Sequence, residues 1–175
     1  MDKDLKLTAR NFIDGESIHS SFDCGEEKLN NFIHKEISLY QRERLGITYL
    51  IHLGSKLVGF VTISMASVKT EKMDFDENLK IRLESYPALQ IGQLAIDKEH
   101  QGKGIGTKII QWCMRQALEY SEDIGCRLLV LNSLPSSVKF YTSCNFEQLK
   151  RQEKRREKVM YLVIPKELFK SKYLL

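Results

Sequence analysis

The sequence predicts a single domain, residues 1–175, built on a mixed α/β sheet. Apolar runs rich in β-branched residues alternate with segments of helical periodicity, in the order β-α-β-β-β-α-β-α-β-β. A glycine-rich turn at residues 101–106 separates an apolar run from the start of a helical pattern. The composition, 42% hydrophobic and 29% charged over 175 residues, is that of one globular domain with its own core.

The first part of the chain is expected to form a strand, a helix and a β-hairpin. Residues 5–11 alternate in polarity, as a strand does. Asp23 is expected to cap the helix that follows. Residues 47–53 and 57–68 are rich in β-branched side chains, and residues 54–55 read as the hairpin turn between them. The apolar residues of the helix fall on one face: Leu29, Phe32, Ile33, Ile37 and Tyr40.

The middle of the chain is expected to hold the central strand and a long helix. Residues 69–79 are charged and read as a surface loop. Residues 81–86 are expected to form a short helical turn that Pro87 ends. Residues 89–97 are expected to form the central strand, and residues 105–120 the helix after the glycine turn.

The last part of the chain is expected to add three strands and a short helix. Residues 126–131 are nearly all apolar, which predicts a buried strand. Ser136 can cap a short helix at residues 137–143. Residues 146–149 and 159–164 are expected to pair as the closing strands of the sheet.

Charge and cysteine usage favour a soluble cytoplasmic protein. The net charge of +4 permits an anionic partner without demanding one. The four cysteines show neither a C-x-x-C pair nor zinc-ligand spacing, so reduced thiols and no metal are expected. No apolar run approaches the roughly 20 residues that a membrane span needs.

The glycine turn is the strongest chemical signal in the sequence. Backbone N–H groups at the start of a helix can converge on an anion, and glycines let that anion come close. The expected ligand is therefore a phosphate or a pyrophosphate. A Walker A loop does not fit, because Gly106 is followed by Thr107 and Lys108 in the wrong order. The dinucleotide fingerprint does not fit either, because Thr107 stands where its third glycine belongs.

The spacing that does fit is Gln/Arg-x-x-Gly-x-Gly/Ala, met by Gln101, Gly104 and Gly106. It resembles the acetyl-CoA loop of the GNAT superfamily of N-acetyltransferases. Residues 136–146 resemble a second family segment, A-x-x-F-Y-x-x-x-G-F, with Asn145 in place of the glycine. Asn tolerates a left-handed backbone, so we expect the turn to survive. The resemblance implies a GNAT-like mixed sheet, mostly antiparallel, with splayed central parallel strands flanked by helices.

The resemblance also implies acetyl-CoA as co-substrate and a set of residues that bind it. The backbone of Leu94 and Ile96 is expected to bind the pantetheine arm, and Asn132 ends the neighbouring strand. The pyrophosphate is expected on the N–H groups of residues 102–107. The loop part of this set is Gln101, Gly102, Lys103, Gly104, Ile105, Gly106 and Thr107.

Tyr141 falls on the family tyrosine that protonates the leaving thiolate of CoA. Amine attack on a thioester expels a thiolate, and a phenol at the sulfur can donate a proton. The alternative is that Phe140 and Tyr141 merely pack a short helix; the glycine turn upstream favours the catalytic role. No general base stands out. An α-amine titrates at about 7.7–8.0, so a strong base is not required.

Residues 22–33 and 86–96 resemble the GNAT toxins of type II toxin–antitoxin modules, which acetylate aminoacyl-tRNA. The resemblance implies an aminoacyl-tRNA acceptor, a cognate antitoxin and a homodimer. Lys150, Arg151 and Arg155 would suit tRNA phosphates, or else belong to a solvated loop. Two alternatives stay open: a GNAT enzyme acting on a small amine or a protein N-terminus, and a non-catalytic CoA-binding module.

Overall fold

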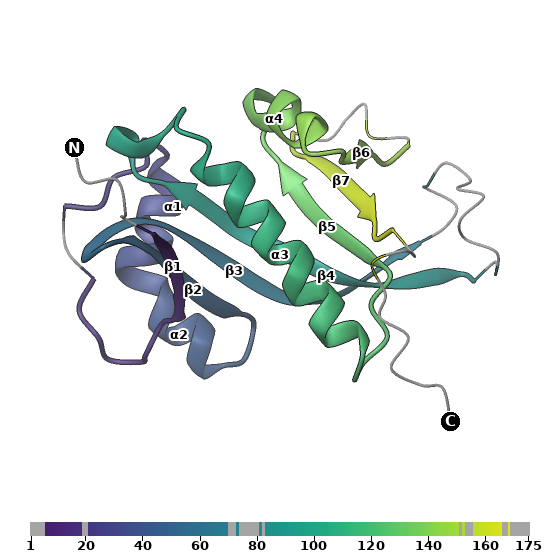
Figure 1. The fold of residues 1–175 in the computed structure, drawn as a ribbon, viewed down its shortest axis with the longest axis horizontal. Coiled ribbons are helices and arrows are strands. Elements are labelled where there is room, and N and C mark those ends of the chain that lie inside the picture. Colours follow the sequence, from purple (N-terminus) through teal and green to yellow (C-terminus); the bar gives the residue numbers. More distant parts are fainter. Residues whose placement is uncertain are drawn as a thin grey trace. The chain divides into compact units, whose positions relative to one another are not determined.

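The computed structural model confirms the predicted order of strands and helices (Figure 1). The residues that it describes are 6–18, 21–69, 73, 81, 83–150, 152, 156–165 and 168. The elements are β1 (Leu7–Asn11), α1 (Glu27–Asn31), η1 (Phe32–Glu36), α2 (Ile37–Arg42), β2 (Ile47–Leu53), β3 (Lys56–Lys69), β4 (Ser85–Ile96), η3 (Lys98–His100), α3 (Ile105–Ser121), β5 (Leu128–Ser133), η4 (Pro135–Ser137), α4 (Val138–Ser143), β6 (Glu147–Gln148) and β7 (Lys158–Val163).

The strands of this described part form a seven-stranded sheet in the order β1-β2-β3-β4-β5-β7-β6. β4 and β5 run parallel, whereas β1–β2, β2–β3, β5–β7 and β6–β7 are antiparallel. The prediction of a mixed, mostly antiparallel sheet with a central parallel pair is therefore confirmed. None of the described helices is long and apolar enough to cross a membrane.

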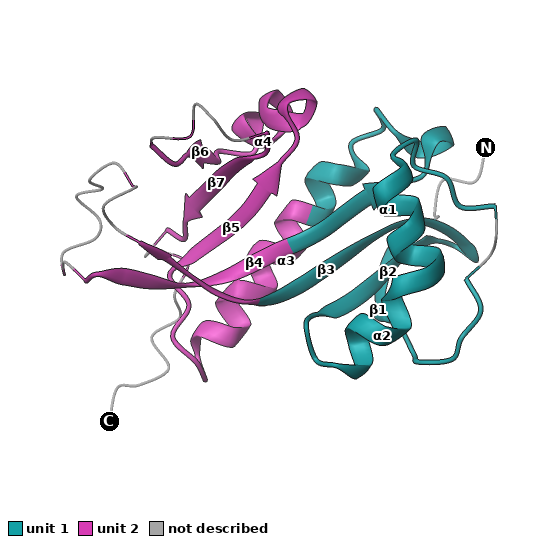
Figure 2. Ribbon diagram, turned by 180° about the vertical axis from the view of Figure 1, so that it is seen from behind, with its two compact units in different colours: residues 1–64, 92–109 teal, residues 65–91, 110–175 magenta. Residues whose placement is uncertain are grey.

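The chain forms two compact units, residues 1–64 with 92–109 and residues 65–91 with 110–175 (Figure 2). Strands β3 and β4 and helix α3 each contribute residues to both units. That the whole chain is a single domain stays a prediction.

The core of the first unit is an aromatic cluster beneath the helical segment α1-η1-α2. Phe60 of β3 lies 5.7 Å from Phe22 and 5.8 Å from Phe32, measured between ring centroids. Ile33 and Ile37 are buried in the same cluster, so the predicted apolar face of the helix is confirmed. The middle of this segment, η1, has π-helical geometry, with the Ile37 N–H donating to the Phe32 carbonyl.

The expectation that Asp23 caps this helix is wrong. The N-cap is Glu26, which makes no side-chain capping bond. The Asp23 carboxylate instead accepts hydrogen bonds from the Gly25 N–H at 2.8 Å and from the Asn30 side-chain amide at 2.7 Å. Asp23 therefore orders the turn before the helix and not its first N–H groups.

The core of the second unit forms where β5 lies between β4 and β7. Residues Leu128 and Leu131 are fully buried, as predicted for this strand. The predicted helical turn at residues 81–86 is wrong, because β4 begins at Ser85 and runs through Pro87. The parallel ladder with β5 starts at the next residue, Ala88. The proline therefore sits just before the point where a missing N–H would cost the ladder a hydrogen bond.

Two glycines of the first unit should differ in how well they tolerate alanine. A Cβ on Gly59 of β3 would lie 2.7 Å from the Ala95 carbonyl oxygen, a contact that backbone cannot relieve cheaply. A Cβ on Gly92 of β4 would meet the Thr62 carbonyl oxygen at 3.6 Å, an ordinary contact. We expect Gly59→Ala to lower the free energy of unfolding by about 1–3 kcal/mol, and Gly92→Ala to leave it nearly unchanged. Urea denaturation of both variants measures this, and equal losses would contradict the strand packing described above.

Candidate functional site

The glycine loop of the first unit has the geometry of an anion site. Gly102 and Gly104 have φ values of 71° and 76°, in the left-handed region that favours glycine. A Cβ at either position would find nothing within 4 Å, so the loop is open on that side. Helix α3 begins at Ile105, and the first N–H groups of a helix have no partner within it. The loop therefore offers N–H donors and the positive end of a helix dipole.

Gln101 holds the start of this loop in place. Its side-chain nitrogen donates to the Ile96 carbonyl at 2.9 Å and to the Cys24 carbonyl at 2.8 Å. The first carbonyl ends β4 and the second belongs to the turn before α1. The side chain is thus engaged with the protein's own backbone, and direct binding of acetyl-CoA by Gln101 stays a prediction.

Asp97 closes the end of β4 as a buried carboxylate. It is 6% exposed and accepts hydrogen bonds from the N–H of Glu99 at 3.1 Å and of Asp23 at 3.3 Å. His100 Nδ1 lies 3.2 Å from the same carboxylate. Burial by itself would raise the pKa of Asp97, but the hydrogen bonds from His100 and the two backbone N–H groups outweigh it and the pKa is lowered. A charged Asp97 therefore fixes the segment that leads into the loop.

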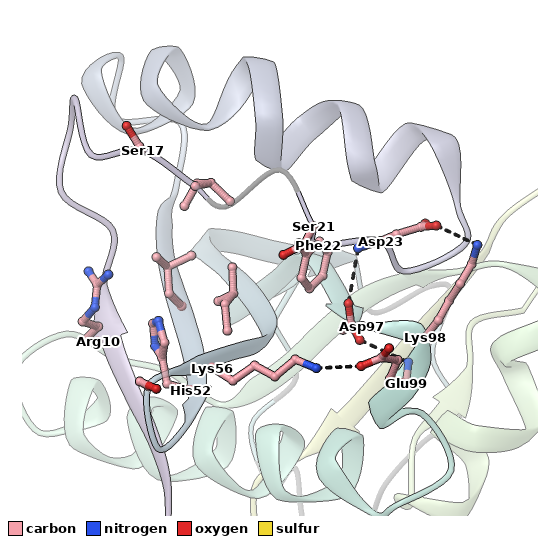
Figure 3. Close-up of a pocket in the computed structure, with 14 residues that line it drawn as sticks. Arg10, Ser17, Ser21, Phe22, Asp23, His52, Lys56, Asp97, Lys98 and Glu99 are labelled. Atoms are coloured by element: carbon pink, nitrogen blue, oxygen red, sulfur yellow. Dashed lines mark hydrogen bonds and ion pairs between the residues drawn. The ribbon is translucent and has the colours of Figure 1, made fainter.

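Two exposed ion pairs flank Asp97 (Figure 3). Lys98 Nζ lies 2.7 Å from the Asp23 carboxylate, and Lys56 Nζ lies 2.6 Å from Glu99. A cavity of about 580 Å³ opens beside them, with Phe22 among its lining residues. Since each of these ammonium groups faces a carboxylate, the cavity wall carries little net charge to attract a phosphate. The glycine loop is the better anion site.

Asp97, Glu99 and His100 are the residues of the described chain whose ligand atoms lie close enough to hold a metal ion, within 4.8 Å of one another. Their atoms already bind within the protein: Asp97 receives three donors, and Glu99 pairs with Lys56. This arrangement fits a structural network. The absence of a metal stays a prediction.

The Asp23–Lys98 pair predicts a pH effect on stability. The Lys98 ammonium, with the Gly25 N–H and the Asn30 amide, lowers the pKa of Asp23 from 3.8 to about 2. A lowered folded-state pKa adds stability that is fully present above the unfolded pKa and is lost as the pH falls through the folded one. Between pH 3.8 and about 2, acidification should therefore destabilise the wild type more steeply than Asp23→Asn. Urea titrations across that range measure both slopes; identical slopes would contradict the assignment.

The two strand residues expected to bind pantetheine lie near the end of β4. The parallel ladder pairs Ala88 to Ile91 with Leu128 to Leu131, so Leu94 and Ile96 lie outside it. Both side chains are partly buried. Asn132 lies on β5 opposite Val159 of β7, and its side chain is exposed. Binding of acetyl-CoA by these residues stays a prediction.

Tyr141 of the second unit is buried, with 8% of its surface exposed. Its ring lies 5.0 Å from that of Phe140 and 5.9 Å from that of Phe146, measured between centroids. Within the described part of the chain, its hydroxyl has no hydrogen-bond partner. Burial, reinforced by Cys113 and Cys144, raises the pKa of Tyr141 to about 12. The phenol therefore keeps its proton at neutral pH.

The turn after Tyr141 has the expected conformation. Asn145 has a φ of 66°, which confirms that asparagine takes the left-handed position here. The Phe146 N–H donates back to the Tyr141 carbonyl at 3.0 Å and closes helix α4. Of the basic residues proposed for tRNA, Lys150 is exposed, whereas Arg151 and Arg155 lie outside the described residues.

The family model of the acetyltransferase (GNAT) family matches residues 16–146, a span that includes the glycine loop and Tyr141. The chain belongs to the GNAT family. By class, this GNAT protein is an acetyl-CoA-dependent N-acetyltransferase, as its motifs predicted. A tRNA-acetylating toxin of Mycobacterium tuberculosis is 22% identical over 130 residues, which cover 73% of this chain and 77% of the relative.

Solved structures of GNAT toxins have the same fold. AtaT complexed with acetyl-methionyl-tRNAfMet superposes with a TM-score of 0.80 at 23% identity, over 90% of this chain and 95% of AtaT. A tyrosine-to-phenylalanine mutant of KacT gives a TM-score of 0.80 at 25% identity, over 93% and 96% of the two chains. AtaTR bound with AcCoA gives 0.76 at 24% identity, over 93% and 95%. The predicted GNAT fold and the predicted likeness to tRNA-acetylating toxins are confirmed.

Sequence reasoning missed the residues that anchor the loop. Asp97 was predicted only as the last residue of the central strand, and Asp23 as a helix cap. Nothing local in the sequence signals that these residues, more than 70 positions apart, bind one another. The signal that was present is Gln101, which the family motif singled out without giving its contacts.

Proposed function

We propose that this GNAT protein transfers the acetyl group of acetyl-CoA to the α-amino group of an aminoacyl-tRNA. The observation that carries the proposal is the open glycine loop at the start of α3, where two left-handed glycines leave room for a diphosphate. The toxin relatives support the choice of acceptor, since one is described as tRNA-acetylating and another is bound to acetyl-methionyl-tRNAfMet.

The loop binds the diphosphate of acetyl-CoA through backbone donors. N–H groups from Gly102 to Thr107 point their partial positive charge at the phosphates, and the α3 dipole adds to it. The exposed ammonium of Lys103 contributes a full charge beside them. The pantetheine arm extends along β4, where the backbone of Leu94 and Ile96 binds it. Asn132 of β5 is the remaining residue that we propose to bind acetyl-CoA.

In the transfer step the neutral amine attacks the thioester carbonyl. The C–N bond forms, the C–S bond breaks, and the sulfur takes the proton of the Tyr141 hydroxyl. The amine nitrogen gives up its proton to water, and the Tyr141 phenolate then takes a proton back from solvent. In water a thiol titrates at about 8.5, so a phenol with a pKa of about 12 would be a weak donor to a solvated thiolate. In a buried site the thiolate is destabilised by the same desolvation as the phenolate, which narrows the gap between their pKa values.

The acceptor supplies its own reactivity and its own charge. The α-amine of an aminoacyl ester has a lower pKa than the α-amine of a free amino acid. A sizeable fraction of the amine is therefore neutral without a strong base. The tRNA phosphates bind to Lys150, Arg151 and Arg155. The affinity for tRNA should therefore fall steeply as the salt concentration rises. A cognate antitoxin and a second copy of the chain are the further proposed partners. The antitoxin is supported by the structure of a mutant of the toxin AtaT bound to the C-terminus of the antitoxin AtaR.

The test is acetyl transfer from labelled acetyl-CoA to a pool of charged tRNAs. The proposal predicts label on the α-amine of at least one aminoacyl-tRNA, which survives as N-acetyl amino acid after mild alkaline release. Uncharged tRNA and free amino acids serve as controls. Label on small amines or peptide N-termini, with none on any aminoacyl-tRNA, would overturn the acceptor and favour the alternative GNAT substrate class.

A further inference from the structure

We infer that Gln101 is a positioning residue that presets the acetyl-CoA loop by binding it to the turn before α1. We call this turn, residues 22–25, the front turn. The inference rests on the proposed function, because it assumes that acetyl-CoA binds at the glycine loop. In this role Gln101 affects acetyl-CoA binding indirectly, by ordering the backbone of the neighbouring loop residues.

The first observation is how the Gln101 side chain is used. A glutamine amide nitrogen has two hydrogens, and here that nitrogen lies within bonding distance of two carbonyl oxygens, those of Cys24 and Ile96. Carbonyls only accept, so a donor is required at this position. Gln101 immediately precedes Gly102, and fixing it fixes the entrance of the loop.

The second observation is that the front turn is itself held rigidly against the end of β4. The Asp23 carbonyl accepts from the Lys98 N–H at 2.9 Å, and the Asp23 N–H donates to Asp97 at 3.3 Å. The Asp23 carboxylate also binds Lys98 Nζ at 2.7 Å (Figure 3). A Cβ on Gly25 would lie 3.0 Å from the Lys98 side chain, so the two segments are in close contact. The Cys24 carbonyl is therefore a fixed acceptor for Gln101.

The front turn is in turn fixed to α1. The Asn30 side chain donates to the Asp23 carboxylate at 2.7 Å and accepts from the Cys24 N–H at 3.0 Å. The path of hydrogen bonds thus runs from Asn30 of the helix, through the front turn, to Gln101 and the loop. All of these residues belong to the first unit.

The reason such an anchor matters is the entropy of the loop. Glycine loses more conformational freedom on ordering than other residues do. Gly102 and Gly104, both in the left-handed region, belong to the loop that forms the anion site. A loop that is ordered before the ligand arrives avoids this loss on binding. Removing the Gln101 bonds should therefore weaken acetyl-CoA binding without altering the chemical step.

The test compares Gln101→Met with Gln101→Arg. Methionine has similar length but donates no hydrogen bond, and we expect the Kd for acetyl-CoA to rise by roughly 10- to 100-fold, with kcat at saturation nearly unchanged. Arginine again offers donors to both carbonyls and should restore Kd to within about threefold. Gln116→Met is the matched control and should leave Kd unchanged. Gln116 is a partly buried glutamine of α3 whose side chain donates to Glu119, three residues further along the helix, at 2.8 Å.

Calorimetric titration of acetyl-CoA gives Kd, and amide hydrogen exchange of the free proteins gives loop order. In Gln101→Met, exchange at residues 102–105 should speed up while the aromatic core of the first unit stays protected. Equal Kd and equal loop exchange in wild type and Gln101→Met would overturn the inference. Core exchange that rises with loop exchange would also overturn it, since the role would then be general stability. If the wild type itself fails to bind acetyl-CoA, the proposed function fails first.

Discussion

Gly104→Asp is expected to weaken acetyl-CoA binding by roughly 100-fold or more. The new carboxylate would extend into the open side of the loop, where a Cβ meets nothing within 4 Å and where the diphosphate is proposed to bind. Two like charges about 4 Å apart at an effective dielectric constant of about 20 repel by about 4 kcal/mol, which more than accounts for the loss. Calorimetric titration of acetyl-CoA measures it.

Two controls separate charge from backbone strain. Gly15 has a φ of 85° and the same open surroundings as Gly104, so Gly15→Asp imposes similar backbone strain away from the loop. Its Kd should equal that of the wild type. Gly104→Asn matches the aspartate in size without its charge, and it should bind acetyl-CoA with an affinity between the two. If Gly104→Asp bound acetyl-CoA with full affinity, the diphosphate could not bind at this loop.

Tyr141→Phe is expected to lower kcat by about 100- to 1000-fold while the Kd for acetyl-CoA stays within about twofold. The hydroxyl has no hydrogen-bond partner among the described residues, and burial raises its pKa to about 12. Removing it therefore breaks no hydrogen bond among the described residues. The thermal midpoint should therefore stay nearly the same, as expected of a group whose role is chemical.

Tyr161→Phe is the matched control in the same unit. The Tyr161 hydroxyl donates to Glu147 at 2.8 Å, so its loss should reduce stability by about 0.5–1.5 kcal/mol and leave kcat unchanged. Tyr141→Phe should thus lose activity and keep its stability, whereas Tyr161→Phe should lose stability and keep its activity. Unchanged kcat in Tyr141→Phe would reduce Tyr141 to a packing residue, and another proton donor would then have to serve the leaving thiolate.

Periodicity predicted the elements well where one pattern dominated. The structure confirms the buried run at Leu128–Leu131, the hairpin of β2 and β3, and the apolar face of the helical segment α1-η1-α2. Prediction went wrong at Pro87, because a proline usually ends an element and here it lies inside β4, just before the ladder with β5 begins. Tertiary pairing overrode the local signal.

The sequence was enough to predict the ligand-binding loop of the candidate site, but not the hydrogen bonds that hold this loop in place. Glycine spacing signals a close backbone approach to a ligand, so the loop at Gly102 and Gly104 could be found from the sequence alone. The Asp23–Asp97–Lys98 contacts could not, because they join segments distant in the sequence through side chains common in any turn. Gln101 links the two kinds of information: its type is in the motif, and its partners are only in the fold.

The proposed chemistry depends on the backbone amides at the start of α3 binding the diphosphate of acetyl-CoA. The most direct measurement is a titration of the ¹⁵N-labelled protein with acetyl-CoA, followed by the chemical shifts of the backbone amides. The largest shifts are expected at residues 102–107, with saturation at the same Kd as in calorimetry. Saturable binding that leaves these amides unmoved would contradict this placement of the diphosphate.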